Sequence, residues 1–241
     1  MMLSNPFRPL KNLSLYAIVG LALMGVTEIF SVLIGVGQLV SPANSLDLDG
    51  EGPVSLWLML QGLVYLLRFP VYIFTIVMFL VWLHRAHANL EPLAGKDLQF
   101  TPGWAVGWWF IPFANLVKPF QAVREVWSES DPDVADQGPT FLSASLRTAP
   151  TYMGAWWAFW LLSNFAANIT SRVYDPDTMA NVEIGGVLFV ATGVLSLIAA
   201  ALAILLVRDI TKRQESRFAN LSSRGHGVLT PPPPPTFGQG F

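Results

Sequence analysis

The sequence has no cysteine and few charged residues. Of its 241 residues, 12% are charged and 53% are hydrophobic. The absence of cysteine excludes disulfides, thiolate catalysis and cysteine metal sites. Soluble domains carry roughly a quarter of their residues as charges, about twice the proportion found here. The composition therefore predicts a membrane protein.

The sequence also lacks the common motifs of catalysis and ligand binding. It contains no GxSxG, HExxH, P-loop or GxGxxG pattern. His84 and His87 lie one helical turn apart with only Glu91 nearby, which is too few ligands for a metal. A net charge of −2 gives no basic surface for nucleic acid. We therefore expect a protein that is not an enzyme and binds no metal, cofactor or nucleic acid.

Long apolar runs are abundant, and each is long enough to cross a bilayer as a helix of about 20 residues. The first run is too long for the apolar part of a cleaved signal peptide, which has about 7 to 15 residues. The fold expected is all-α and integral to the membrane, with residues 1–12 as a cytoplasmic N-terminal tail. The four expected transmembrane helices are residues 13–40, 54–83, 149–170 and 184–207.

The positions of lysine and arginine predict the topology, because cytoplasmic segments collect them. With four spans and both termini in the cytoplasm, Arg172 is the one basic residue in the outer connections. A fifth crossing would place the basic C-terminal tail outside. We therefore expect a multi-pass protein of the cytoplasmic (inner or plasma) membrane. Its single membrane domain covers 13–217, and residues 218–241 form a disordered, proline-rich cytoplasmic tail.

The tryptophan- and proline-rich stretch 101–127 must then enter and leave at the cytoplasmic face. Thr101 can cap a first short helix, while Pro112 and Pro119 interrupt it. A turn at membrane depth needs its backbone groups satisfied, and the Asn115 amide is the expected supplier. The stretch is either a re-entrant helical hairpin or an amphipathic helix lying in the interface, anchored by its tryptophans.

Glu28 and Arg68 are the ionisable residues inside the expected spans. They lie equally far in sequence from the middle of the acidic connection between the first two spans, so an antiparallel helix pair places them at the same depth. An unpaired charge there is costly, so we expect an intramembrane ion pair. The pair acts either as an ion or proton relay or as a structural contact that fixes the register of the two helices.

Other polar residues suggest a network or docking face near the cytoplasmic surface. Trp156, Trp160, Asn164 and Asn168 repeat every fourth residue, and Thr192, Ser196 and Ala200 do the same. Each set provides either helix-packing contacts or the wall of a polar cavity. The candidate network is Arg85, Asn89, Trp104, Trp108, Trp109, Pro112, Asn115, Arg124, Glu125, Asn164 and Asn168. The C-terminal cluster Arg208, Lys212, Arg213 and Arg217 either sets topology or binds anionic lipid headgroups.

Several runs carry a resemblance to a known family. They are WLHRAHAN at 82–89, PGWAVGWWFIPFANLVKPFQAVREVW at 102–127, DP at 131–132, WWAFWLLSN at 156–164 and VRDITKRQ at 207–214. Together they resemble a bacterial membrane family, the domain-of-unknown-function family 4328. The resemblance implies a multi-span membrane domain and no specific activity.

Two functions are compatible with these features. The first is a non-enzymatic scaffold that binds the bilayer, a protein partner or a second copy of itself. The alternative is a pathway for a small solute or ion, built around the broken helix 101–127 and the Glu28–Arg68 pair. A cavity joining the ion pair to Asn115 and Asn164 favours the pathway, whereas tightly packed spans favour the scaffold.

Overall fold

The computed structural model describes residues 6–40, 56–94, 98–132, 149–173 and 179–227, and it contains helices and no strands over these ranges. This agrees with the expected all-α fold. The elements in chain order are α1 (Lys11–Val40), α2 (Leu56–Ala88), α3 (Leu90–Ala94), α4 (Pro102–Gly107), η2 (Trp108–Phe110), η3 (Ala114–Leu116), α5 (Lys118–Glu129), α7 (Thr151–Val173) and α8 (Met179–Gly227).

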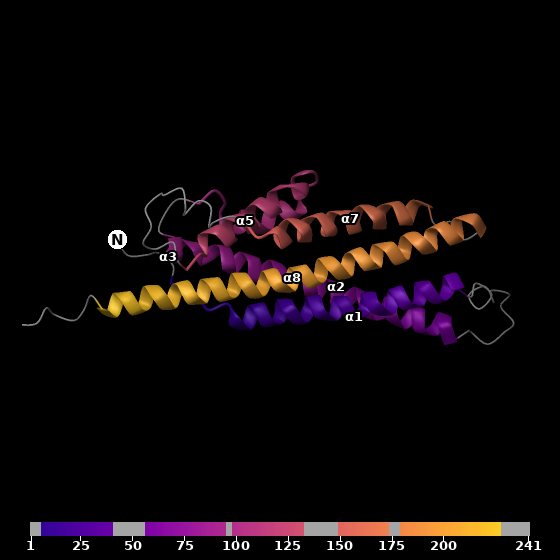
Figure 1. The fold of residues 1–241 in the computed structure, drawn as a ribbon, viewed down its shortest axis with the longest axis horizontal. Coiled ribbons are helices and arrows are strands. Elements are labelled where there is room, and N and C mark those ends of the chain that lie inside the picture. Colours follow the sequence, from indigo (N-terminus) through magenta and orange to yellow (C-terminus); the bar gives the residue numbers. More distant parts are fainter. Residues whose placement is uncertain (1–5, 41–55, 95–97, 133–148, 174–178, 228–241) are drawn as a thin grey trace, which may run out of the picture.

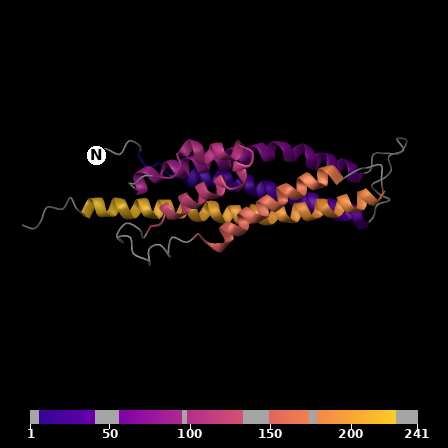
Figure 2. The ribbon, with the colours of Figure 1, turned by 90° about the horizontal axis from the view of Figure 1, so that it is seen from above.

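The four longest helices, α1, α2, α7 and α8, run lengthwise through the molecule (Figures 1 and 2). α1 packs along α2 and α8, and α8 also packs along α7. α2 and α7 have little direct contact with each other. The order across the molecule is therefore α2, α1, α8, α7. The short helices α4, η2, η3 and α5 lie beside one end of this group (Figure 1).

Glycines permit the close contact between α1 and α8. A Cβ added to Gly193 would lie 2.5 Å from Val32 Cγ2, and one added to Gly186 would lie 2.8 Å from Leu39 Cδ2. Both distances are too short for a real side chain, so these positions let the helix axes approach each other.

Three helical segments are long and apolar enough to cross a membrane: Lys11–Gly37, Gly62–Leu93 and Ile184–Ser223. They correspond to the first, second and fourth expected spans. α7, the third expected span, is not among these candidates. Trp156, Trp160 and Asn164 interrupt its apolar sequence and lower its hydropathy.

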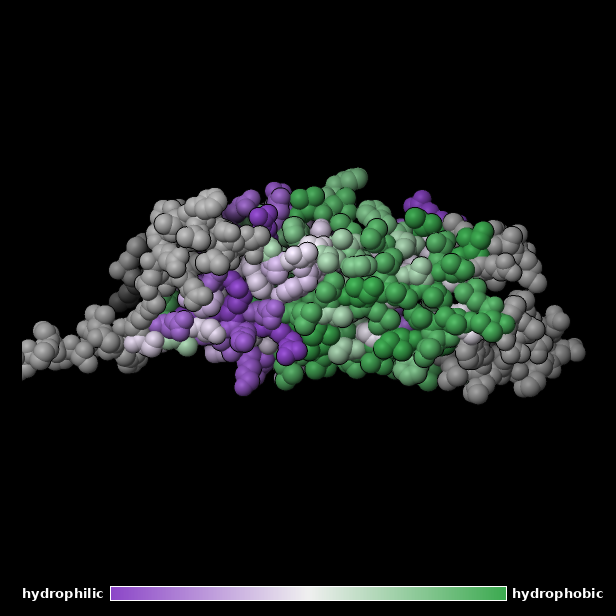
Figure 3. Space-filling view, in the orientation of Figure 1, coloured by the Kyte–Doolittle hydropathy of each residue, from purple (hydrophilic) through white to green (hydrophobic). Residues whose placement is uncertain are grey.

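The C-terminal boundary expected from the sequence needs correction. α8 continues as helix to Gly227, so the tail expected to be disordered from residue 218 begins as part of α8; residues beyond 227 lie outside the described ranges. Phe218 stacks on Phe7 with ring centroids 4.2 Å apart, which attaches this part of α8 to the N-terminal segment. Hydrophilic residues gather toward the end of the molecule where α8 finishes, and apolar residues cover most of the remaining described surface of this face (Figure 3).

The stretch 101–127 folds into a hairpin. The Thr101 hydroxyl accepts a hydrogen bond from the Trp104 backbone N–H, which caps α4 as expected. The chain reverses at Phe113, the one non-glycine residue with positive φ (63°) in the described ranges. Large apolar side chains are exposed at this tip, with Phe110 at 68% and Phe113 at 87%.

Candidate functional site: a cavity beside the hairpin

A cavity of about 540 Å³ lies among the four long helices and the hairpin, within the size range of small-molecule sites. α2 and α7 line two opposite sides of the cavity, and α1 and α8, which lie between them, line the side that connects the two. The hairpin contributes Trp109, Phe110 and Asn115. The polar and charged residues lining the cavity are Glu28, Arg68, Tyr72, Thr75, Asn115, Ser163, Asn164, Thr192 and Ser196.

The structure brings Glu28 and Arg68 together as the matched depths predict. Arg68 Nη2 lies 2.5 Å from Glu28 Oε1, and the two side chains are 31% and 5% exposed. Glu28 lies at the contact between α1 and α8, where its Oε2 is 3.7 Å from the Cβ position of Gly193. The guanidinium is therefore the more accessible half of the pair.

The expected stripe on α7 lies along the cavity wall. Trp156, Trp160 and Asn164 line the cavity, and so do Thr192 and Ser196 of α8. These positions therefore form a polar cavity wall, the second interpretation that their spacing allowed. The Asn164 Nδ2 donates to the Trp160 carbonyl at 2.7 Å, which fixes the amide on the wall.

Asn168 does not share this position. It is exposed and does not line the cavity, and its Nδ2 donates to the Asn164 carbonyl at 3.4 Å.

Four buried polar atoms of the hairpin have no hydrogen-bond partner among the described residues: Trp108 Nε1, Trp109 Nε1, Asn115 Oδ1 and Gln121 Oε1. Two of these four residues, Trp109 and Asn115, border the cavity. A buried polar group without a partner costs about 1–3 kcal/mol, so these atoms destabilise the hairpin unless the structure shifts to satisfy them.

The Trp109 ring is held edge-on by its neighbours. Its centroid lies 5.6 Å from that of Phe79, 5.8 Å from that of Trp157 and 5.4 Å from that of Trp160. Edge-to-face contacts of this kind are favourable and directional, so they fix the orientation of the indole.

The expected role of Asn115 is wrong in one respect. No hydrogen bond joins its side-chain amide to the freed backbone of the turn in the described structure. Instead, Trp157 Nε1 donates to the Leu116 carbonyl at 3.1 Å. The tryptophan of α7 therefore satisfies the broken backbone, and Asn115 faces the cavity.

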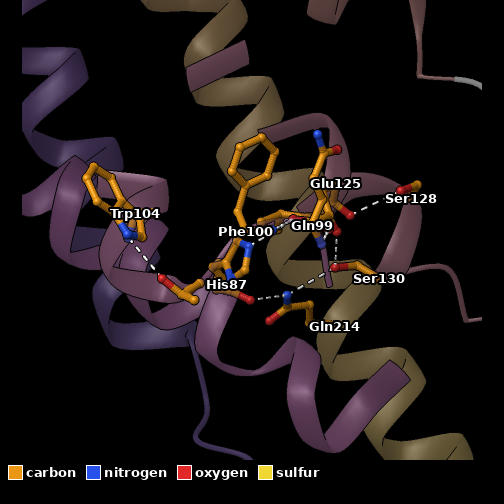
Figure 4. A network of polar contacts seen from close by, with 11 residues as sticks. His87, Gln99, Phe100, Trp104, Glu125, Ser128, Ser130 and Gln214 are labelled. Carbon is orange, nitrogen blue, oxygen red and sulfur yellow. Dashed lines mark hydrogen bonds and ion pairs between the residues drawn. The ribbon is translucent and has the colours of Figure 1, made fainter. Parts of the chain in front are cut away.

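Glu125 of α5 closes the root of the hairpin (Figure 4). Its carboxylate accepts hydrogen bonds from the backbone N–H of Gln99 at 2.5 Å and of Phe100 at 3.2 Å. It also contacts His87 Nε2 at 3.0 Å, and His87 is fully buried. The chain therefore leaves the hairpin beside the point where it entered.

A second group of hydrogen bonds joins α2, α5, α8 and the N-terminal segment. The Asn89 amide exchanges hydrogen bonds with the backbone of Arg8 at 3.1 and 2.9 Å and donates to Gln214 Oε1 at 3.2 Å. Gln214 Nε2 donates to the Ala86 carbonyl at 2.7 Å and to Ser130 Oγ at 3.0 Å. Asn89 and Glu125 were expected in a polar network, whereas His87, Gln214 and Ser130 were not.

A family model matches residues 54–212, from the beginning of α2 into the last part of α8. The chain belongs to the family described as Domain of unknown function (DUF4328). The DUF4328 match includes Arg68, the hairpin and the α7 stripe, whereas Glu28 precedes it. No curated protein and no solved structure matches the chain.

The remaining residues of the expected docking face lie outside both groups of hydrogen bonds. Arg124 is exposed and Arg85 is half-buried, and neither side chain hydrogen-bonds within the described ranges. Trp104 is half-exposed and its ring lies 4.7 Å from that of Trp108. Pro112 is exposed beside the tip.

Two members of the C-terminal basic cluster, Arg213 and Arg217, have internal partners. Binding of anionic lipid headgroups by the cluster stays a prediction. Arg213 pairs with Asp131 at 2.9 Å and covers the Trp127 ring at 4.3 Å. Arg217 is buried, and its Nη1 donates to the carbonyls of Glu129 at 2.6 Å and Asp131 at 3.2 Å. Both therefore stabilise the C-terminal end of α5, where cations are favoured. Of the four, Arg208 and Lys212 are exposed.

Proposed function

We propose that this DUF4328 protein is a non-enzymatic membrane protein that provides a pathway for a small solute, with the cavity as its binding site. One observation supports this above the others. The cavity joins the Glu28–Arg68 pair to Asn115 and Asn164, which come from different elements. The interior therefore offers the polar groups that a solute needs on leaving water.

The threading that we propose has four spans, with α7 as the third in chain order and the hairpin as a re-entrant element. α7 has 23 residues, or about 35 Å at 1.5 Å per residue, and it packs along α8. Its tryptophans and asparagines lower its hydropathy, but several of them line the cavity rather than face lipid. The exposed Phe110 and Phe113 favour insertion of the tip into apolar surroundings.

Discontinuous helices are a common way to build a solute site at membrane depth, because broken ends leave polar groups unused. The hairpin fits this pattern. It leaves Trp109 Nε1 and Asn115 Oδ1 without partners, and both residues line the cavity. The Glu125 carboxylate meanwhile fixes the hairpin root, so the two groups are held in place by a defined frame.

Thiol labelling tests the proposal, since the chain has no native cysteine. Ser196→Cys places a thiol on the cavity wall, and Leu162→Cys places one on the exposed surface of α7 outside the cavity. In membrane vesicles, a small water-soluble methanethiosulfonate should react with the first and spare the second, which faces lipid. Equal rates, or no reaction at Ser196→Cys, would refute a solute-accessible cavity.

A scaffold that binds a protein partner is the second candidate. The half-exposed Trp104 and the exposed Arg124 favour it, because both sit on a hairpin whose root is fixed. A photo-crosslinking residue at Trp104 should then capture a defined protein partner or a second copy of the chain. The same residue at Phe113 should capture lipid. Lipid adducts alone at both positions would count against the scaffold.

A further inference from the structure

We propose that the cavity binds an amphiphilic carboxylate from the bilayer, with the carboxylate on Arg68 and the apolar chain extending toward the hairpin. This inference rests on the proposed function and names the chemistry of its ligand. It depends on three features: the unused donors of Arg68, the shape of the apolar walls, and the arrangement of α2 and α7.

Arg68 is the anchor because most of its hydrogen-bonding capacity is unused. A guanidinium has five N–H donors in a planar fork, and the described structure gives Arg68 one hydrogen bond, to Glu28. Its side chain is 31% exposed and lines the cavity. A carboxylate matches two parallel N–H groups of the fork, which a lysine cannot offer.

Glu28 determines what kind of anion the site accepts. Its charge balances that of Arg68, so the pair has no net charge to attract an inorganic anion. It is also buried behind the guanidinium, at the α1–α8 contact. Binding must therefore combine the directional hydrogen bonds of Arg68 with burial of an apolar body. A small hydrophilic anion supplies only the first of these.

The cavity has room for such a body. From Arg68 to Leu80 the lining of α2 extends about 18 Å at 1.5 Å per residue. The walls along this length are mainly apolar and include Leu21, Met24, Ile76 and Phe79. At the hairpin end, the cavity is closed by Trp109, Phe110 and Asn115.

The bilayer is the favoured source because of how α2 and α7 are placed. They meet through Phe79 and Trp156, whose ring centroids are 6.3 Å apart beside the hairpin, but they do not pack along their lengths. Arg68 lies three helical turns from Phe79 along α2, away from this contact. An amphiphile can therefore enter sideways between α2 and α7 and leave its head group at Arg68.

The test measures protection of the Ser196→Cys thiol in phosphatidylcholine nanodiscs. Dodecanoate should slow its labelling about tenfold, the effect of one charge-assisted hydrogen-bonded contact. Methyl dodecanoate, which lacks the carboxylate, and butyrate, which lacks the long chain, should protect little.

Arg68→Lys should abolish most of the protection by dodecanoate. The double variant Glu28→Gln/Arg68→Gln, which leaves no unpaired charge, should do the same, whereas Arg85→Gln on the same helix should not.

The outcomes separate this inference from the proposed function. Rapid labelling that dodecanoate does not slow overturns the carboxylate ligand and leaves the solute-accessible cavity standing. Equal protection by butyrate or by methyl dodecanoate also overturns it, as does full protection in both Arg68 variants. Absence of labelling in the unprotected protein refutes the accessible cavity and the inference with it.

Discussion

Arg68 and Glu28 share a hydrogen bond of 2.5 Å in an apolar region, so each charge depends on the other. We expect Arg68→Leu to lower the stability by about 3 kcal/mol, because it leaves the buried Glu28 unpaired. The double variant Glu28→Gln/Arg68→Leu should recover most of this loss. Thermal unfolding in detergent measures both. Equal losses in the single and double variants would mean that the unpaired charge of Glu28 is not the cause of the loss.

The turn of the hairpin gives a second residue-scale prediction. Asn115→Leu should change the stability little, because Asn115 Oδ1 has no partner to lose. Trp157→Phe should cost about 1–3 kcal/mol, because it leaves the Leu116 carbonyl without its donor. Comparison of the two melting temperatures decides which residue supports the turn. A larger loss for Asn115→Leu would restore the role expected from the sequence.

Some of these residues could be predicted from the sequence, whereas others could not, because their contacts join elements whose relative positions the sequence pattern does not determine. A charge in an apolar run is conspicuous, and Glu28 and Arg68 could be paired by counting along two adjacent helices. The contact of His87 with Glu125 joins α2 to α5, and no periodicity fixes the distance between them. The spacing of Phe79, Leu83 and His87, four residues apart on one face of α2, was a usable signal that His87 is buried.

At the scale of elements, the hairpin depends on one carboxylate. Glu125→Ala removes the acceptor for the backbone N–H groups of Gln99 and Phe100 and the partner of the buried His87. We expect faster amide hydrogen exchange across residues 98–117, measured by mass spectrometry, because the entering arm is released. Arg124→Ala, at the exposed neighbouring position, is the matched control and should exchange like the unmodified protein. The same slow exchange in both variants would assign the closure to other contacts.

The elements themselves were largely predictable, but their spatial order was not. Thr101, Pro112 and Pro119 act through local backbone geometry, so they predict the break in the helix. The order α2, α1, α8, α7 depends on packing between distant segments, such as the contact of Gly193 with Val32. The cavity follows from that order. The sequence therefore indicated polar wall residues and left open whether they faced a neighbouring helix or a hollow.

At the scale of the whole molecule, hydrogen bonds at one end connect α2, α5, α8 and the N-terminal segment. Gln214 of α8 contacts α2 through Ala86 and α5 through Ser130. Asn89 connects the same group to the N-terminal segment. These contacts hold the hairpin root, the last part of α8 and the N-terminal segment together at one end of the molecule. The proposed threading therefore places all three on the same side of the membrane.

Topology mapping tests that arrangement directly. Lys212→Cys places a thiol at an exposed position on the polar end. Ser45→Cys places one in the acidic segment between α1 and α2. Ser130 is unsuitable because it is fully buried and hydrogen-bonded to Gln214.

In intact cells, a membrane-impermeant maleimide should label Ser45→Cys, and Lys212→Cys should react only after permeabilisation. Arg124→Cys, an exposed position on α5, should behave like Lys212→Cys, because the proposed threading returns the hairpin to the face from which it enters. Labelling of Arg124→Cys from outside, with Lys212→Cys protected, would mean that the stretch 101–127 crosses the membrane.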